Sequence, residues 1–154
     1  MKFIVVAIGH RMPAWVDSGF AEYAGRMPRE ARIELAALKP AQRGGPVKRV
    51  LEAEGERILS ALPAGCVKVA LDERGTLVDT MALARRMARW RESGRNVAFI
   101  VGGADGLAES VKASADFVWS LSALTLPHGL ARVVLAEQLY RAHSILHNHP
   151  YHRE

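Results

Sequence analysis

Hydrophobic residues along this chain fall into short apolar runs that alternate with segments of helical spacing. The runs predict β-strands, and the segments between them, where apolar side chains recur every three or four positions, predict helices. The expected strands cover residues 2–8, 32–38, 67–71, 97–101 and 117–121. The expected helices cover residues 14–26, 47–61, 80–92, 107–113 and 129–147.

This alternation predicts right-handed crossovers and a mostly parallel sheet flanked by helices on both faces. Three residues that favour helix ends support the boundaries: Pro13 early in the first helix, Asp79 before the third helix and Gly94 after it. The chain has 154 residues and neither an internal repeat nor a linker-like tract. We therefore expect a single α/β domain over residues 1–154.

The last expected helix carries a broad apolar stripe. Its members recur at helical spacing, as is typical of a face that packs on a core. They are Val134, Leu135, Leu139, Ala142, Ile145 and Leu146. A stripe this broad also favours a self-complementary face, and hence a homodimer.

Composition places the chain among ordinary globular proteins, because 49% of its residues are apolar and 24% are charged. No apolar run is long enough to span a bilayer. Residues 1–8 are apolar but lead directly into Gly9-His10-Arg11, so we expect a core strand there and not a signal peptide. The single cysteine, Cys66, excludes an intrachain disulfide and fits a reducing, cytoplasmic setting.

A formal net charge of +5 favours a polyanionic partner. The positive charges also cluster, which favours nucleic acid over a merely basic surface. One cluster lies in or beside a loop rich in proline and glycine, a second lies on the third expected helix and just after it, and a third lies near the expected site. The members are Lys39, Arg43, Lys48 and Arg49; Arg85, Arg86, Arg89, Arg91 and Arg95; and Arg132, Arg141 and Arg153.

Three expected strand ends suggest a ligand site. Gly102 and Gly103 follow the fourth strand, Leu71 ends the third, and the small-residue segment 121–126 follows the fifth. Ligands of open α/β sheets bind outside the carboxyl ends of strands, and glycine lets them approach the main chain. The sequence therefore predicts a small-molecule site at this edge, and hence an enzyme.

Several familiar sites are excluded by their missing residues. The turn after the first strand has only Gly9, so it lacks the dinucleotide fingerprint, and no segment matches a phosphate-binding P-loop. His143 and His147 are four residues apart, but no third metal ligand is evident, and we expect no metal site. Ser120 and Ser122 lack the flanking glycines of a hydrolase nucleophile.

Several motifs together resemble one family, the ribosomal RNA large subunit methyltransferase H family of the SPOUT class. They lie at residues 7–15, 22–23, 52–56, 102–106, 119–128, 139–142 and 148–154. The resemblance runs from end to end of the chain. It implies a SPOUT-type (α/β knot) fold with a C-terminal trefoil knot, and a homodimer whose active site draws on both subunits.

The same resemblance implies S-adenosylmethionine as the methyl donor. The implied substrate is a pseudouridine of 23S large-subunit ribosomal RNA, at position 1915, methylated at N3 on the assembled ribosome. Cofactor contacts carried over from the family fall on Leu71, Gly102, Gly103, Leu121, Ser122, Ala123, Leu124, Thr125 and Leu126.

Methyl transfer to N3 requires that the methyl donor and the base be aligned. It also requires cationic groups that stabilise the base once N3 has lost its proton. The candidate catalytic residues are His128, Arg132, Arg141, Tyr151 and His152. In this hypothesis Tyr151 shapes the pocket around a flipped base and His152 helps to remove its proton. Two alternatives stay open: a SPOUT methyltransferase for another RNA nucleotide, and a non-catalytic module that binds RNA or the ribosome.

Overall fold

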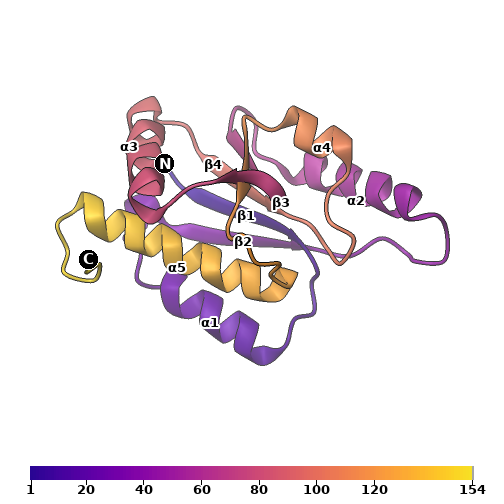
Figure 1. Ribbon diagram of the computed structural model, residues 1–154, viewed down its shortest axis with the longest axis horizontal. Helices are drawn as coiled ribbons and strands as arrows, with labels where there is room; N and C mark the ends of the chain where they lie inside the picture. The colour runs from indigo at the N-terminus through magenta and orange to yellow at the C-terminus, as the bar shows by residue number, and fades with distance from the viewer. Residues whose placement is uncertain (154) are drawn as a thin grey trace.

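The structure, a computed structural model, describes residues 1–153 and contains a five-stranded sheet in which every strand pairing is parallel (Figure 1). The strands are β1 (Phe3–Ile8), β2 (Ile33–Leu38), β3 (Val67–Leu77), β4 (Val97–Val101) and β5 (Phe117–Ser120). The helices are α1 (Ala14–Ala24), α2 (Val47–Ala61), α3 (Thr80–Ser93), α4 (Glu109–Ser114) and α5 (His128–Leu146), with a 3-10 turn at Arg29–Ala31. The strand order is β2-β1-β4-β3-β5, so the fold class predicted from the alternation, a mostly parallel sheet flanked by helices, is confirmed.

The sheet separates two apolar layers because successive side chains of a strand point to opposite faces. One layer joins the face of β1 that carries Phe3 and Val5 to helices α1, α3 and α5. The other joins the face that carries Ile4 and Val6 to α2 and α4. Both faces of every central strand are therefore covered, which explains why β1 and β4 are apolar at every position.

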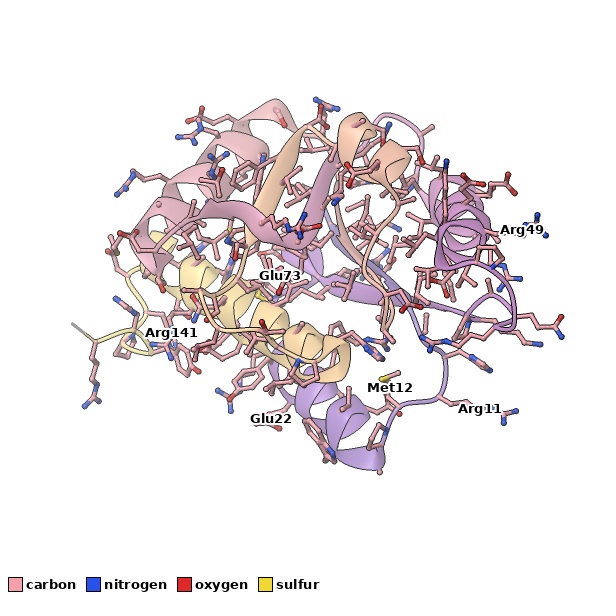
Figure 2. The ribbon with its side chains drawn as sticks, turned by 45° about the vertical axis from the view of Figure 1, so that its right-hand side comes forward. Arg11, Met12, Glu22, Arg49, Glu73 and Arg141 are labelled. Carbon is pink, nitrogen blue, oxygen red and sulfur yellow. The ribbon has the colours of Figure 1, made fainter. Side chains whose placement is uncertain are left out.

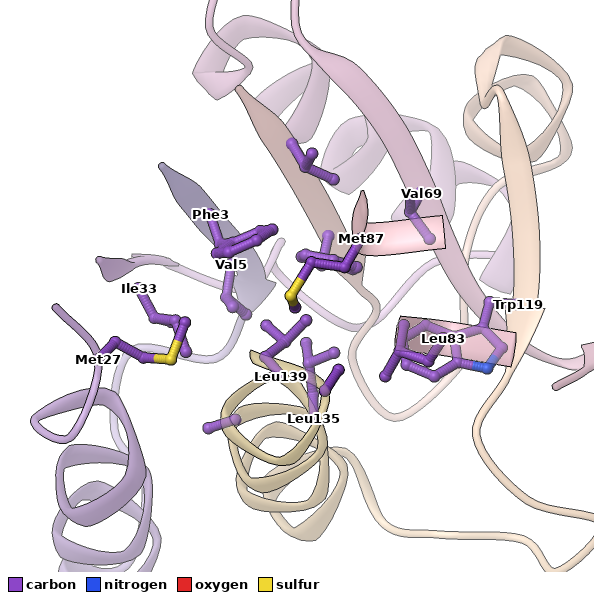
Figure 3. Packing of buried hydrophobic residues seen from close by; sticks show 14 of the residues in the cluster. Phe3, Val5, Met27, Ile33, Val69, Leu83, Met87, Trp119, Leu135 and Leu139 are labelled. Atoms are coloured by element: carbon purple, nitrogen blue, oxygen red, sulfur yellow. The ribbon is translucent and has the colours of Figure 1, made fainter. Parts of the chain in front are cut away.

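Helix α5 lies against the larger layer, where Leu135 and Leu139 point at the sheet beside Met87 (Figure 3). Leu135, Leu139 and Ala142 are fully buried, which confirms core packing for the centre of the predicted stripe. Val134, Ile145 and Leu146 are only partly buried. Ile145 and Leu146 pack at the margin of the larger layer, so part of the stripe keeps some exposed apolar surface in a single chain.

Strand β3 is longer than predicted. It continues to Leu77 after a bulge, since Leu71 and Thr76 both pair with Trp119 of β5. Gly75 lets the two strands meet there: a Cβ at this position would lie 2.8 Å from main-chain atoms of Val118 and Trp119. The predicted strand ended at Leu71 because the apolar run stops there and the next residues are polar. In the structure the bulge places these polar residues outside the regular pairing of the sheet.

The predicted helix ends differ from the observed ones by at most two residues. The Asp79 carboxylate accepts a hydrogen bond of 2.8 Å from the Ala82 N–H, and Gly94 ends α3 with a φ of 70°. Pro13 immediately precedes α1. Among the helices of residues 1–153, none is both long enough and apolar enough to cross a membrane. The trefoil knot and the single-domain organisation stay predictions.

Candidate functional site

A cleft of about 900 Å³ opens at the carboxyl ends of β3, β4 and β5. The bulge of β3 forms one wall, the glycine loop 102–106 forms another, and the segment 121–127 with the start of α5 closes the third side. The predicted position of the ligand site is therefore the position of the largest cleft described. Its volume suits a ligand of the size of a nucleoside derivative, because small-molecule sites commonly enclose 300–1,000 Å³.

Almost all of the residues expected to hold a cofactor line this cleft. They are Leu71, Gly102, Gly103, Leu121, Ser122, Leu124, Thr125 and Leu126. Ala123 alone of the expected set is not among the lining residues. Of the candidate catalytic residues, His128 also lines the cleft.

The glycine loop is shaped by the absence of side chains. A Cβ on Gly102 would lie 2.5 Å from the carbonyl oxygen of Gly106, and one on Gly103 would lie 3.0 Å from Ile8 Cγ2. The Gly106 N–H donates to the Gly103 carbonyl at 3.1 Å, and Gly106 has a φ of 83°, which favours glycine. This wall of the cleft is consequently bare main chain.

The two serines beside the cleft build its loop. The Ser120 hydroxyl is buried and donates to the Ser122 carbonyl at 2.9 Å. Ser122 Oγ accepts the N–H of Leu124 at 2.9 Å. These bonds hold segment 120–124 in a turn, and neither serine has the surroundings of a nucleophile.

The wall formed by the β3 bulge is acidic, which the sequence analysis missed. Asp72 pairs with Lys112 at 3.1 Å, and Glu73 accepts a 3.2 Å hydrogen bond from the Thr125 hydroxyl across the cleft. Burial alone would raise the pKa of Asp72, but the Arg74 N–H and the Lys112 ammonium outweigh it and hold that pKa below its ordinary value. Asp72 and Glu73 could have been predicted as cleft residues from the sequence, because they directly follow Leu71 at the end of an expected strand.

Behind His128, the guanidinium of Arg132 is buried, with only 1% of the residue exposed. Its Nη2 donates to the carbonyls of Ile8 at 3.1 Å and Gly9 at 2.7 Å, while its Nε has no partner within residues 1–153. Burial, followed by the charge of Arg132, lowers the pKa of His128. This lowering favours the neutral form of the imidazole.

The other three candidates gather along the second half of α5, around Glu137 at its midpoint. Arg141 Nε donates to Glu137 Oε1 at 2.7 Å, and the Tyr151 hydroxyl donates to the same oxygen at 3.2 Å. The Arg141 guanidinium lies 4.7 Å from the centre of the Tyr151 ring and 3.4 Å from Nδ1 of His152. Burial and Glu137 raise the pKa of Tyr151. We call these four residues the tail cluster.

One chain does not bring its candidate catalytic residues together. Arg141 follows His128 by thirteen residues on the same helix, which corresponds to roughly 20 Å along its axis. In Figure 2 Glu73, a cleft residue, lies near the middle of the molecule and Arg141 lies at its left edge. Of the tail motif, Glu154 lies outside the described residues.

Within the described part of the chain, residues 1–153, no three His, Cys, Asp or Glu side chains are grouped to hold a metal ion. His143 and His147 stack with ring centres 4.1 Å apart, and burial lowers the pKa of His143 to about 4. Cys66 is buried, and burial raises the pKa of its thiol. It therefore resembles a small apolar residue more than a reactive one.

Comparison with solved structures supports the fold. A probable methylase family protein from Haemophilus influenzae Rd KW20 superposes with a TM-score of 0.58 over 95% of this chain and 66% of that chain. The two sequences are 14% identical, so this similarity concerns the fold alone.

Comparison with known sequences is more specific. Proteins named "Ribosomal RNA large subunit methyltransferase H" from Ralstonia pickettii and Nitrosospira multiformis are each 54% identical to this chain, and one from Ralstonia nicotianae is 56% identical. Each alignment covers 99% of both proteins. The profile of the family described as "Predicted SPOUT methyltransferase" matches residues 1–152. The resemblance found in the sequence is confirmed, and the chain belongs to the SPOUT methyltransferase family.

Proposed function

We propose that this chain transfers a methyl group from S-adenosylmethionine to N3 of a pseudouridine, position 1915, in 23S ribosomal RNA on the assembled ribosome. The name shared by its full-length relatives supports a large-subunit ribosomal RNA substrate. The observation that carries the proposal is the cleft, because its walls are the residues that the resemblance assigns to the cofactor. A ribosomal substrate also places the reaction in the cytoplasm.

Three features of the cleft support S-adenosylmethionine as its ligand. The bare main chain at Gly102 and Gly103 admits a flat base against the wall, while Leu71 and Leu126 offer apolar contacts. The carboxylate of Glu73 faces the cleft and would attract the cationic parts of the ligand. When bound, the cofactor supplies an electrophilic methyl group on a sulfonium.

The residues of this chain would then prepare the base. N3 of the base loses its proton and becomes nucleophilic, and the guanidinium of Arg141 stabilises the resulting negative charge. The ring of Tyr151 bounds the pocket for the flipped base, and His152 accepts the proton. We assign Arg132 to positioning, since its buried guanidinium binds the Ile8 and Gly9 carbonyls and orders the loop beside His128.

The separation of the two groups of residues within one chain supports a homodimer. If the tail cluster is to act on a base held at the cleft, a second copy must bring its own tail there. The partly buried Val134, Ile145 and Leu146 of α5 supply apolar surface for such an interface. We propose that each complete site combines the cleft of one subunit with the tail cluster of the other.

Mixed dimers test this arrangement. A Gly102→Ala subunit has a damaged cleft and an intact tail, whereas a chain lacking residues 151–154 has the reverse. Alone, the Gly102→Ala protein is expected to be about 100-fold less active than the wild type, and the truncated protein is expected to be inactive. Mixing them under exchange conditions is expected to restore about half of the wild-type activity per mixed dimer. Mixtures with no activity, from subunits shown to exchange, would contradict a shared site.

The function itself is tested on ribosomes that lack this methyl group. Radiolabelled S-adenosylmethionine, enzyme and 70S ribosomes are incubated, and the labelled nucleotide is located by nuclease digestion and mass spectrometry. We expect N3-methylpseudouridine at position 1915. Label at another nucleotide would favour a SPOUT methyltransferase that acts on a different target. If the enzyme binds S-adenosylmethionine but transfers no label to the ribosome, the proposed substrate is wrong.

A further inference from the structure

Two sets of exposed arginines and lysines lie at different parts of the molecule, a first group on loop 9–13 and segment 39–49 and a second group on α3. Loop 9–13 follows β1 and segment 39–49 follows β2, so both lie at the carboxyl edge of the sheet, where the cleft opens. Arg89 and Arg91 belong to the second half of α3, which leads toward the opposite edge, where β4 begins. Only the first group lies at the edge of the sheet where the cleft opens.

Contacts join both of these segments to the cleft walls. Arg43 pairs with Asp105 of the glycine loop at 3.1 Å. Glu54, a buried residue of α2, accepts the N–H of Ala41 at 3.1 Å. On the other side, a Cβ on Gly129 would lie 3.4 Å from Met12 Sδ, so loop 9–13 lies beside the first turn of α5. The basic segments are therefore held at fixed places beside the site.

The charges of these segments are largely unneutralised. Segments 9–13 and 39–49 contain five arginines and lysines and no acidic residue. Of these, Arg11, Lys39, Lys48 and Arg49 are exposed, and none of the four forms an ion pair among residues 1–153. Figure 2 shows Arg11 and Arg49 projecting from the same side of the molecule, away from Arg141. We call these four residues the cleft-edge basic surface.

A role in stability does not explain these charges. Lys48 and Arg49 lie in the first turn of α2, where the helix dipole disfavours cations, and this turn contains no acidic residue. By contrast, several arginines of the second group have structural partners. Arg86 lies 3.6 Å from the centre of the Phe117 ring, and Arg95 donates to the carbonyls of Gly65 and Cys66.

From this placement we propose that the cleft-edge basic surface binds phosphates of the RNA strand that flanks the target nucleotide. This inference rests on the proposed function, since it assumes that an RNA base enters the cleft. Cations beside the cleft can contact the backbone of a strand whose base lies in it, and cations on the distal half of α3 of the same chain are less suitably placed. Removing these charges should therefore lower the affinity for RNA without changing the affinity for the cofactor.

Two charge-matched double variants test the assignment: Lys48→Gln with Arg49→Gln, and the control Arg89→Gln with Arg91→Gln. Binding of a fluorescein-labelled RNA hairpin is measured by anisotropy over a range of salt concentrations. Loss of two phosphate contacts is expected to weaken binding about 20-fold near 0.15 M salt and to reduce the salt slope by about 1.4–1.8. The control pair is expected to bind like the wild type.

Steady-state methylation of ribosomes gives a second readout. The Lys48/Arg49 variant is expected to show a raised KM for ribosomes with kcat and cofactor affinity unchanged. Equal losses in both double variants, or hairpin binding unchanged by Lys48→Gln and Arg49→Gln, would overturn the assignment. Weaker ribosome binding with unchanged hairpin binding would instead indicate an acidic protein surface as the partner. If wild-type enzyme binds the hairpin but methylates no ribosome, the proposed function fails while the phosphate surface is still tested by binding.

Discussion

Replacing Gly102 by alanine adds one methyl group to the wall of the cleft. The new Cβ would lie 2.5 Å from the Gly106 carbonyl oxygen and 2.7 Å from its carbon, whereas ordinary contacts begin near 3.4 Å. The overlap is therefore about 0.9 Å, and it is with main-chain atoms that cannot rotate away. Gly106 is also held by its hydrogen bond to Gly103, so the whole loop must move.

The size of the effect follows from this overlap. Overpacking of this kind costs about 1–3 kcal/mol of folding free energy. For a chain of this length, each kcal/mol lowers Tm by about 2–4 °C, so a loss of roughly 2–12 °C is expected. The effect on catalysis is larger, because a displacement of about 1 Å at a site that works by alignment lowers the rate about 100-fold.

Thermal unfolding and cofactor calorimetry measure the two effects separately. Gly45→Ala is the matched control, since no atom lies within 4 Å of its Cβ position, and it is expected to change stability by less than about 1 kcal/mol. Wild-type cofactor affinity and unchanged Tm in Gly102→Ala would refute the reasoning that this wall needs bare main chain.

Three further changes have defined outcomes. Arg132→Met leaves the buried carbonyls of Ile8 and Gly9 without donors, so urea unfolding should show a loss of about 1–3 kcal/mol, and equal or greater stability would contradict that role. Burial lowers the pKa of His143 from 6.5 to about 4, so between these values the unfolded chain binds more protons than the folded chain. Stability therefore rises with pH across this window and is lost as the pH falls toward 4, by at most about 3 kcal/mol. His143→Gln should flatten the pH dependence of unfolding between pH 6.5 and 4, and an unchanged slope would exclude this residue as its source. Deletion of residues 151–154 should abolish methylation while S-adenosylmethionine still binds, and a fully active truncated enzyme would disprove the role of the tail.

The central strands β1 and β4 were predictable because each is an uninterrupted apolar run covered on both faces, and Asp79 and Gly94 marked the ends of α3. The pattern failed at β3, whose second part follows Asp72, Glu73 and Arg74. Pairing with Trp119 across a bulge is a tertiary contact, and no local periodicity reports it. The acidic wall of the cleft was missed for the same reason.

The position of the cleft was predictable because glycines and strand ends coincide there, whereas the burial of individual side chains was not. Arginine is normally exposed, so nothing in the sequence reveals that Arg132 is enclosed and bound to the end of β1. The motifs likewise suggest Arg141, Tyr151 and His152 as catalytic candidates without giving the distance along α5 that separates them from the cleft. That distance is a property of the folded chain.

The central claim is that the cleft at the ends of β3, β4 and β5 holds S-adenosylmethionine. Calorimetric titration of the purified protein with S-adenosylmethionine tests it most directly, with Gly102→Ala as the paired variant. Saturable binding to the wild type, weakened at least tenfold by the variant, is the predicted result, and fewer than one ligand per subunit would indicate an asymmetric dimer. No binding at millimolar cofactor, or equal binding to both proteins, would contradict the account.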